Sequence, residues 1–232
     1  MRKIIFLLMA FSCAMLSAQG TRVVFIGDSI TDGNWGVVSN YEPTSAGRSQ
    51  TDMNHIYGHG YVMLIASHYQ SKYPRKGYEF FNRGISGHRL CDLAARWKED
   101  VLDLHPDVLS VLIGTNDVHS YIYSGTAEPF DIEAWETTYR GLLQQVRKQN
   151  PSVKLVLCAP FSPLDQALTA SLAAAVKELS REFGAVYVPF DSMFGKLLSR
   201  GDAPNYWIWD KIHPTPAGHR RMSELWMRKV RL

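Results

Sequence analysis

The most constraining feature of this sequence is a repeated alternation between short, continuously apolar runs and longer segments with helical periodicity. The short runs have the β-branched and aromatic composition of strands, at residues 22–26, 78–82, 108–113, 153–158 and 185–188. Helical patterns separate and follow them, at residues 60–73, 92–104, 132–149, 164–183 and 216–230. Apolar strands that alternate with helices predict a parallel sheet covered by helices on both faces, which is an α/β fold.

Length and composition indicate one domain with a single core. The chain has 232 residues, of which 46% are apolar and 20% charged, enough to bury a sizeable core. Because it shows no internal repeat or linker, we predict a single domain over residues 19–232. A net charge of +3 gives neither the basic face of a nucleic-acid-binding protein nor a polybasic membrane anchor. The apolar fraction and only three cysteines exclude disordered chains and disulfide scaffolds.

The first 18 residues have the pattern of a secretory signal peptide. Arg2 and Lys3 precede an apolar run over residues 4–16, and Ala18 ends a small-residue cleavage site. The run is shorter than the roughly 18 residues that span a bilayer, so we do not expect it to be a membrane anchor. After its cleavage, no stable membrane insertion is expected. Lipid attachment at Cys13 is an alternative that the bulky residue two positions before it disfavours. We expect a secreted or periplasmic protein.

Function is expected in the turns that follow the strands, because ligands bind at the carboxyl ends of a parallel sheet. The first strand runs into a Gly-Asp-Ser sequence that places Ser29 in a tight turn before a helix. The second turn contains Gly84 and Gly87, and the third contains Asn116. Backbone N–H groups and an amide side chain can hold a developing oxyanion. Each turn also has a structural interpretation, as a helix cap or a tight turn.

An Asp-x-x-His spacing near the C-terminus joins Asp210 and His213. Pro214 keeps His213 out of helical geometry, whereas Thr215 and Pro216 suit the N-cap and first position of the last helix. Asp210 can then accept a hydrogen bond from Nδ1 of His213, which leaves Nε2 free to take a proton from a serine. A simple surface pair is the alternative.

Together, the four segments resemble the four blocks of the SGNH or GDSL hydrolase superfamily, a Gly-Asp-Ser, a glycine, a Gly-x-Asn-Asp and an Asp-x-x-His, over residues 21–232. The resemblance implies a flavodoxin-like three-layer α/β/α sandwich, here with a five-stranded parallel sheet. It also implies hydrolysis of esters or thioesters without metal or cofactor. The chain lacks the Gly-x-Ser-x-Gly elbow of α/β-hydrolases, which argues against that fold.

The same resemblance implies a role for each motif residue. Ser29 would be the nucleophile, His213 the general base and then acid, and Asp210 the carboxylate that orients it. The oxyanion hole would combine the backbone N–H groups of Ser29 and Gly84 with the side chain of Asn116.

Substrate recognition is expected in the long segment that starts beside Ser29, residues 34–59, because long loops in compact domains tend to be functional. Its side chains, with two tryptophans of the last turn, can stack on and hydrogen-bond a sugar; packing onto the domain is the alternative for each. The candidates are Trp35, Tyr41, Arg48, Asp52, Asn54, His55, His59, Trp207 and Trp209. We expect deacetylation of a small-molecule or oligosaccharide ester. A lysophospholipase or thioesterase is the alternative within the enzyme class, and a non-catalytic carbohydrate-binding module is the alternative outside it.

No metal or cofactor site is predicted. His55 and His59 are four residues apart, but no glutamate follows His55 and the neighbouring glycines disfavour a helix there. A dinucleotide-binding fingerprint is missing as well. Cys91 and Cys158 could form a disulfide in an oxidising compartment, with a buried free thiol at Cys158 as the other interpretation.

Overall fold

A computed structural model of the protein describes residues 20–37, 44–203 and 205–232. The predicted signal peptide with Cys13, and the loop residue Tyr41, lie outside these described residues. The strands are β1 (Arg22–Gly27), β2 (Glu79–Gly84), β3 (Val108–Leu112), β4 (Lys154–Cys158) and β5 (Val186–Val188). The helices are α1 (Ser29–Asp32), α2 (Tyr61–Lys72), α3 (Leu90–Ala95), α4 (Trp97–Asp100), α5 (Thr115–Ser124), α6 (Ile132–Gln149), α7 (Gln166–Glu182), α8 (Phe190–Leu198) and α9 (Pro216–Val230).

The five strands form one parallel sheet in the order β2-β1-β3-β4-β5. The register pairs Gly27 at the end of β1 with Gly84 of β2 and with Leu112 of β3. From β1 the chain first builds outward to β2, and it then continues on the other side with β3. Such a reversal leaves a crevice at the carboxyl ends of β1 and β3, where ligands bind in open α/β sheets.

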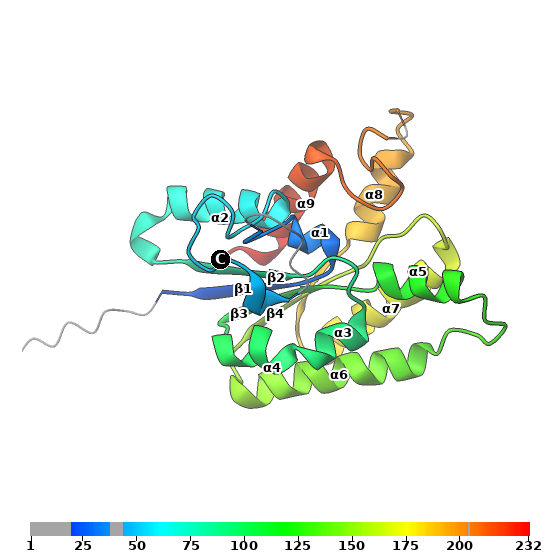
Figure 1. Cartoon of the computed structure of the whole chain (residues 1–232), viewed down its shortest axis with the longest axis horizontal. Helices are drawn as coiled ribbons and strands as arrows, with labels where there is room; N and C mark the ends of the chain where they lie inside the picture. The colour runs from blue at the N-terminus through cyan, green and yellow to red at the C-terminus, as the bar shows by residue number, and fades with distance from the viewer. Residues whose placement is uncertain (1–19, 38–43, 204) are drawn as a thin grey trace, which may run out of the picture.

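Helices cover both faces of the sheet, which gives the three layers of the predicted sandwich (Figure 1). On one face, α2, α8 and α9 pack a cluster around Phe25 and Trp226; on the other, α3 to α7 pack around Ile26 and Trp97. Trp226 also donates a hydrogen bond to Oγ of Ser110 on β3, at 3.0 Å. The flavodoxin-like α/β/α architecture predicted from the sequence is confirmed.

One predicted helix needs correction, and two helices of the structure were not predicted. The segment 92–104 is interrupted at Arg96, whose guanidinium donates to the carbonyls of Arg83 (2.7 Å) and Gly27 (3.1 Å) and to the Asp100 carboxylate (2.6 Å). These bonds hold the carboxyl ends of β1 and β2, and the helix is interrupted where Arg96 makes them. The helices α5 and α8 were not predicted, since α5 is rich in residues of low helix propensity and α8 is short and contains Gly195.

Both cysteines of the described part of the chain are free, Cys91 at the surface and Cys158 in the core. The disulfide interpretation is therefore wrong for this structure. Burial raises the pKa of Cys158 to about 12, so its thiol stays protonated and unreactive at neutral pH.

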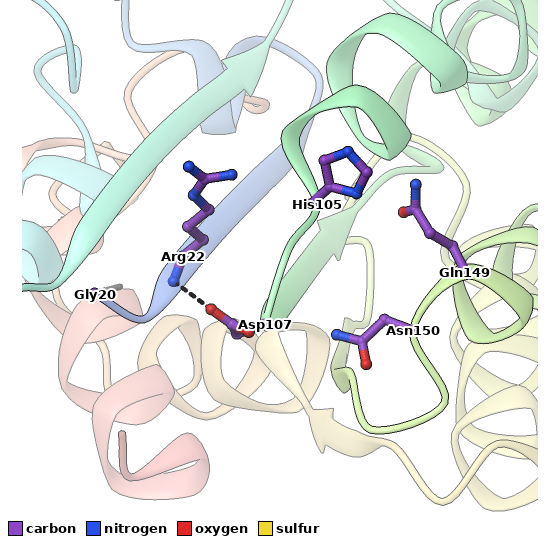
Figure 2. A pocket seen from close by; sticks show the side chains of 6 residues that line it. All are labelled: Gly20, Arg22, His105, Asp107, Gln149 and Asn150. Atoms are coloured by element: carbon purple, nitrogen blue, oxygen red, sulfur yellow. Dashed lines mark hydrogen bonds between the residues drawn. The ribbon is translucent and has the colours of Figure 1, made fainter. Parts of the chain in front are cut away.

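A hollow of about 320 Å³ lies at the amino ends of the strands (Figure 2). It is lined by Arg22 at the start of β1, Asp107 just before β3, and Asn150 just after α6. The backbone N–H of Arg22 donates to the Asp107 carboxylate at 2.8 Å. These residues lie at the amino ends of the strands, whereas Ser29 follows the carboxyl end of β1. The hollow is therefore at the opposite end of the strands from the turns in which function is expected. No helix within the described ranges is both long and apolar enough to cross a membrane.

Candidate active site

Ser29 is the first residue of α1, directly after β1. The Asp28 side chain caps this helix by accepting the N–H of Ile30 at 3.0 Å, and Gly33 ends it in the left-handed conformation with a φ of 52°. A Cβ on Gly27 would lie 2.3 Å from the carbonyl oxygen of Leu112, so only glycine fits where the strand turns into the helix. The result is a half-buried Ser29 hydroxyl at the carboxyl edge of the sheet.

Asp210, His213 and Ser29 form an unbroken chain of hydrogen bonds. Nδ1 of His213 lies 2.6 Å from Oδ2 of Asp210, and Nε2 lies 2.8 Å from Oγ of Ser29. The other Asp210 oxygen accepts the backbone N–H groups of Ile212 (3.0 Å) and His213 (2.7 Å). Partial burial acts to raise the pKa of Asp210, but the hydrogen bonds from His213 and Ile212 outweigh it and the pKa is lowered. The carboxylate is therefore charged and fixes the ring with Nε2 toward Ser29.

The turn that carries His213 is closed by local contacts. Lys211 has a φ of 72°, a left-handed conformation that is uncommon for a side chain with a Cβ and that reverses the chain within the motif. The backbone of Trp209 donates to the His213 carbonyl at 3.1 Å, and Thr215 donates to the Trp207 carbonyl at 3.0 Å. Thr215 also caps α9, as its sequence position predicts.

The structure corrects the prediction for Gly84. Its backbone N–H donates to Oδ1 of Asn82 at 2.9 Å, and its carbonyl accepts the Trp35 indole N–H at 2.7 Å. A Cβ at this position would lie 2.3 Å from the backbone nitrogen of Asp32, so Gly84 is packed against α1. Both of its backbone groups are used inside the protein, and its N–H is not available to an oxyanion.

Gly87, three residues later, has the properties that Gly84 lacks. It is exposed, has a φ of 83°, and has no atom within 4 Å of a Cβ position. Among the described residues, no group accepts its backbone N–H or that of Ser29. The Asn116 amide donates one hydrogen to the His88 carbonyl at 3.1 Å, which leaves the second for a ligand. The sequence signal for Gly87 was the second glycine of the same turn.

Two predicted sugar contacts lie inside the domain instead. Trp35 is 1% exposed and Arg48 is 4% exposed, and the Arg48 guanidinium pairs with the Asp32 carboxylate. Assigning Trp35 and Arg48 to a ligand is therefore wrong for this structure, because protein groups already occupy their faces and donors.

The other candidate sugar contacts include one buried residue and three exposed ones. Trp207 is buried, with its indole N–H on the Asp202 carboxylate at 2.8 Å, and supports the last turn. Asn54 and His59 are exposed. Trp209 is 64% exposed, and its ring is stacked near that of His213, with centroids 6.3 Å apart. Asn54, His59 and Trp209 thus remain open to a ligand.

His119 is a candidate that sequence reasoning missed. It lies on α5 three residues after Asn116, a spacing that puts both on one helix face. Its Nε2 is 3.2 Å from Oγ of Ser162, in the loop after β4. Burial and the nearby His213 lower the pKa of His119, so its ring is neutral at pH 7. No periodic signal marked it, because α5 itself was not predicted.

Two buried carboxyls lie beneath this edge. Burial raises the pKa of Asp28 to about 7 and that of Asp117 to about 6. Asp117 accepts the backbone N–H of Leu90 (3.2 Å) and the indole N–H of Trp135 (3.0 Å), whereas Oδ2 of Asp28 has no partner among the described residues. No cluster of three metal-ligating side chains occurs in the described part of the chain.

Comparison with known proteins assigns the chain to a family. Residues 25–221 match the GDSL-like lipase/acylhydrolase family. An acetylxylan esterase of Geobacillus stearothermophilus is 30% identical in an alignment of 229 positions that covers 93% of this chain and 96% of the relative. Crystal structures of this esterase include catalytic mutants in which a serine, an aspartate and a histidine are replaced by alanine.

Solved structures show the same relation. A putative GDSL-like lipase from Parabacteroides merdae superposes with a TM-score of 0.78 and 30% identity, covering 91% of this chain and 96% of that one. The Geobacillus acetylxylan esterase superposes with a TM-score of 0.76 and 29% identity, covering 92% and 95%. The resemblance predicted from the four motifs is thereby confirmed. The chain belongs to the GDSL-like lipase/acylhydrolase family and is a carboxylic ester hydrolase.

Proposed function

We propose that the protein is a serine esterase in which Ser29 is the nucleophile, His213 the general base and acid, and Asp210 the orienting carboxylate. The observation that carries the proposal is the hydrogen-bond chain from Asp210 through His213 to Oγ of Ser29, at 2.6 and 2.8 Å. Nucleophilic catalysis requires a nucleophile and a base within hydrogen-bond reach of each other, with a third group that orients the base.

In the acylation step, Nε2 of His213 takes the Ser29 proton as Oγ attacks the ester carbonyl. The imidazolium then gives this proton to the leaving alcohol oxygen, and an acyl-enzyme remains. Water, activated by the same Nε2, attacks the acyl-enzyme and releases the carboxylic acid and free Ser29. Asp210 stays ionised throughout and stabilises the imidazolium.

The oxyanion of both tetrahedral intermediates would accept hydrogen bonds from three donors. These are the backbone N–H of Ser29, the backbone N–H of Gly87, and the free amide hydrogen of Asn116. Gly87 replaces Gly84 in this assignment, because the Gly84 N–H already binds Asn82. Preorganised donors of this kind are worth roughly 2.7–4 kcal/mol each.

The substrate we propose is an acetyl ester of a carbohydrate. The relatives support it, since the Geobacillus protein is an acetylxylan esterase and one of its structures is described as an acetyl-xylooligosaccharide esterase. The exposed Trp209 ring beside His213 offers an apolar face on which a sugar can stack. The half-buried His119 offers a polar ring on the α5 side, where its Nε2 lies 3.2 Å from the buried Ser162 hydroxyl.

We propose that residues 1–18 are removed on export, so that residues 19–232 form a single domain facing substrates outside the cytoplasm. N-terminal sequencing of the protein recovered after export tests the cleavage, with Gln19 as the expected first residue, and a single cooperative unfolding transition of this protein tests the single domain.

The deciding experiment is a hydrolysis panel with wild-type protein and Ser29→Ala. Acetyl, butyryl and octanoyl esters of one alcohol are compared first, followed by acetylated xylooligosaccharides. We expect the acetyl esters to be preferred and Ser29→Ala to abolish turnover with little change in Tm. A preference for octanoyl above about tenfold, roughly 1.4 kcal/mol in transition-state binding, would favour the lysophospholipase or thioesterase alternative.

A further inference from the structure

A fully buried ion pair joins Arg48, which the sequence analysis offered as a sugar contact, to Asp32, which it left without a role. The Arg48 guanidinium donates to both carboxylate oxygens of Asp32, and neither side chain has any exposed surface. Arg48 also donates to the Trp35 carbonyl at 2.9 Å. A buried ion pair adds little net stability compared with apolar residues of similar volume, because desolvation offsets the attraction. Its presence beside a catalytic centre therefore calls for a role other than stability.

The Asp32 carboxylate has a second set of donors on the turn after β2. Its Oδ2 accepts the backbone N–H of Ser86 at 2.9 Å and the Ser86 hydroxyl at 2.7 Å. Ser86 directly precedes Gly87. Asp32 itself is the last residue of α1, the helix that begins with Ser29. One carboxylate thus connects the nucleophile's helix to the residue before Gly87.

Additional contacts hold the same turn from below. Trp35 donates to the Gly84 carbonyl at 2.7 Å, and two guanidinium groups lie over its ring, with Arg48 at 5.1 Å and Arg83 at 4.8 Å from the ring centroid. The amide of Asn82 donates to the Asp32 carbonyl at 3.1 Å. The turn is therefore bonded on both sides to α1 and to the residues that follow it.

We propose that the Asp32–Arg48 ion pair is a positioning device that holds the Ser86–Gly87 peptide, so that the Gly87 N–H is aimed at the oxyanion formed at Ser29. This inference rests on the proposed function. Arg48 orients Asp32, Asp32 binds both donors of Ser86, and Ser86 sets the direction of the next peptide N–H. None of the three touches the substrate.

The proposal predicts a specific kinetic signature. An oxyanion exists only in the transition states and tetrahedral intermediates, so a misaimed donor lowers kcat and leaves KM nearly unchanged. The loss is the same for acetyl and butyryl esters, because every ester produces the same oxyanion. A residue with a purely structural role would lower Tm without this signature.

The test compares Arg48→Met and Ser86→Ala with two matched controls far from the site. Arg147→Met removes a guanidinium that donates to the carbonyls of Pro151, Val153 and Phe183. Ser180→Ala removes a buried hydroxyl that donates to the Val176 carbonyl at 2.8 Å. Tm, kcat and KM for an aryl acetate, and the rate of fluorophosphonate labelling, are measured for all four variants below their melting temperatures.

We expect Arg48→Met to lower kcat by about 10–100-fold and Ser86→Ala by about 3–10-fold, fractions of the roughly 10²–10³ for a lost donor. KM should change less than threefold, labelling should slow in parallel, and the controls should keep kcat within twofold. If Arg48→Met does not fold, Ser86→Ala decides. Unchanged kcat in Ser86→Ala, or equal kcat losses in variants and controls, would overturn the inference. Substantial remaining turnover in Ser29→Ala would instead overturn the proposed function.

Discussion

The two sides of the candidate active site are built in opposite ways. On one side, the Asp210 and His213 side chains are 25% and 35% exposed, and their mutual contacts lie within one short turn. On the other side, the Asp32 and Arg48 side chains are completely buried. Their contacts join residues 16 and 54 positions apart in the sequence.

The difference follows from what each side has to do. In the proposed mechanism, the imidazole would move a proton along hydrogen bonds that themselves orient the ring, so a local turn with a charged carboxylate is sufficient. The oxyanion donors must already point at a position that is occupied only during the reaction, and this requires groups fixed before the substrate arrives. In this proposal, the exposed turn would transfer the proton, and the buried side would hold the oxyanion donors in place.

The largest expected effect separates the members of the exposed turn. His213→Ala should lower kcat by on the order of 10⁴–10⁶, and Asp210→Asn by on the order of 10³–10⁴, because the asparagine keeps the turn but loses the charge that stabilises the imidazolium. Steady-state kinetics on an aryl acetate measure both. Because triad members act as a unit, the double variant Ser29→Ala/His213→Ala should be no slower than Ser29→Ala alone; full additivity would mean that the two residues do not share one step.

The next effect concerns the donors. Asn116→Ala should lower kcat by about 10²–10³ through loss of one oxyanion donor, and by a similar factor for acetyl and butyryl esters. The measurement is kcat for the two esters in wild type and variant. An effect confined to the longer acyl chain would place Asn116 in an acyl-binding surface and not in the oxyanion hole.

A smaller effect compares two tryptophans, one from each side. Trp209→Ala should reduce kcat/KM for an acetylated xylooligosaccharide about 3–10-fold more than for an aryl acetate, since only the sugar reaches an exposed ring. Trp35→Phe, which loses the hydrogen bond to Gly84, should lower kcat for both substrates equally. If Trp35→Phe were selective for the oligosaccharide, the buried side would take part in recognition after all.

A separate effect, on stability, is a pH-dependent term beneath the nucleophile. Burial raises the pKa of Asp28 from 3.8 to about 7, so between these values the folded state keeps a proton that the unfolded state has lost. Asp28 therefore makes the free energy of unfolding fall as the pH rises toward 7, with no further change above it. Asp28→Asn keeps the helix cap and removes this titration.

Relative to wild type, Asp28→Asn should gain about 1–3 kcal/mol in the free energy of unfolding between pH 5 and pH 8. Urea unfolding at the two pH values measures it. A stability difference between variant and wild type that is the same at both pH values would show that Asp28 does not titrate in this range.

The same contrast explains what the sequence could reveal. The strands and the last helix were predictable because apolar runs and capping residues are local signals, and the resulting sheet is confirmed. The Asp210–His213 spacing is equally local, and the structure places these side chains 2.6 Å apart; their catalytic roles remain a proposal.

The buried side could not be predicted from local signals. Choosing between Gly84 and Gly87 requires knowing that Asn82 occupies the Gly84 N–H. Assigning Arg48 requires knowing that the loop folds under α1 and pairs with Asp32. Before folding, a tryptophan and an arginine in a long loop are as suited to a sugar as to a buried ion pair, and only the tertiary packing decides between the two.

Covalent labelling is the most direct test of whether Ser29, activated by His213, is the nucleophile. A fluorophosphonate reacts with wild type and with His213→Ala, and mass spectrometry of the intact protein and its peptides locates the adduct. We expect one phosphonyl group per wild-type chain, on Ser29, formed far more slowly in His213→Ala. An adduct on another residue, or no adduct on a protein that hydrolyses acetyl esters, would contradict it.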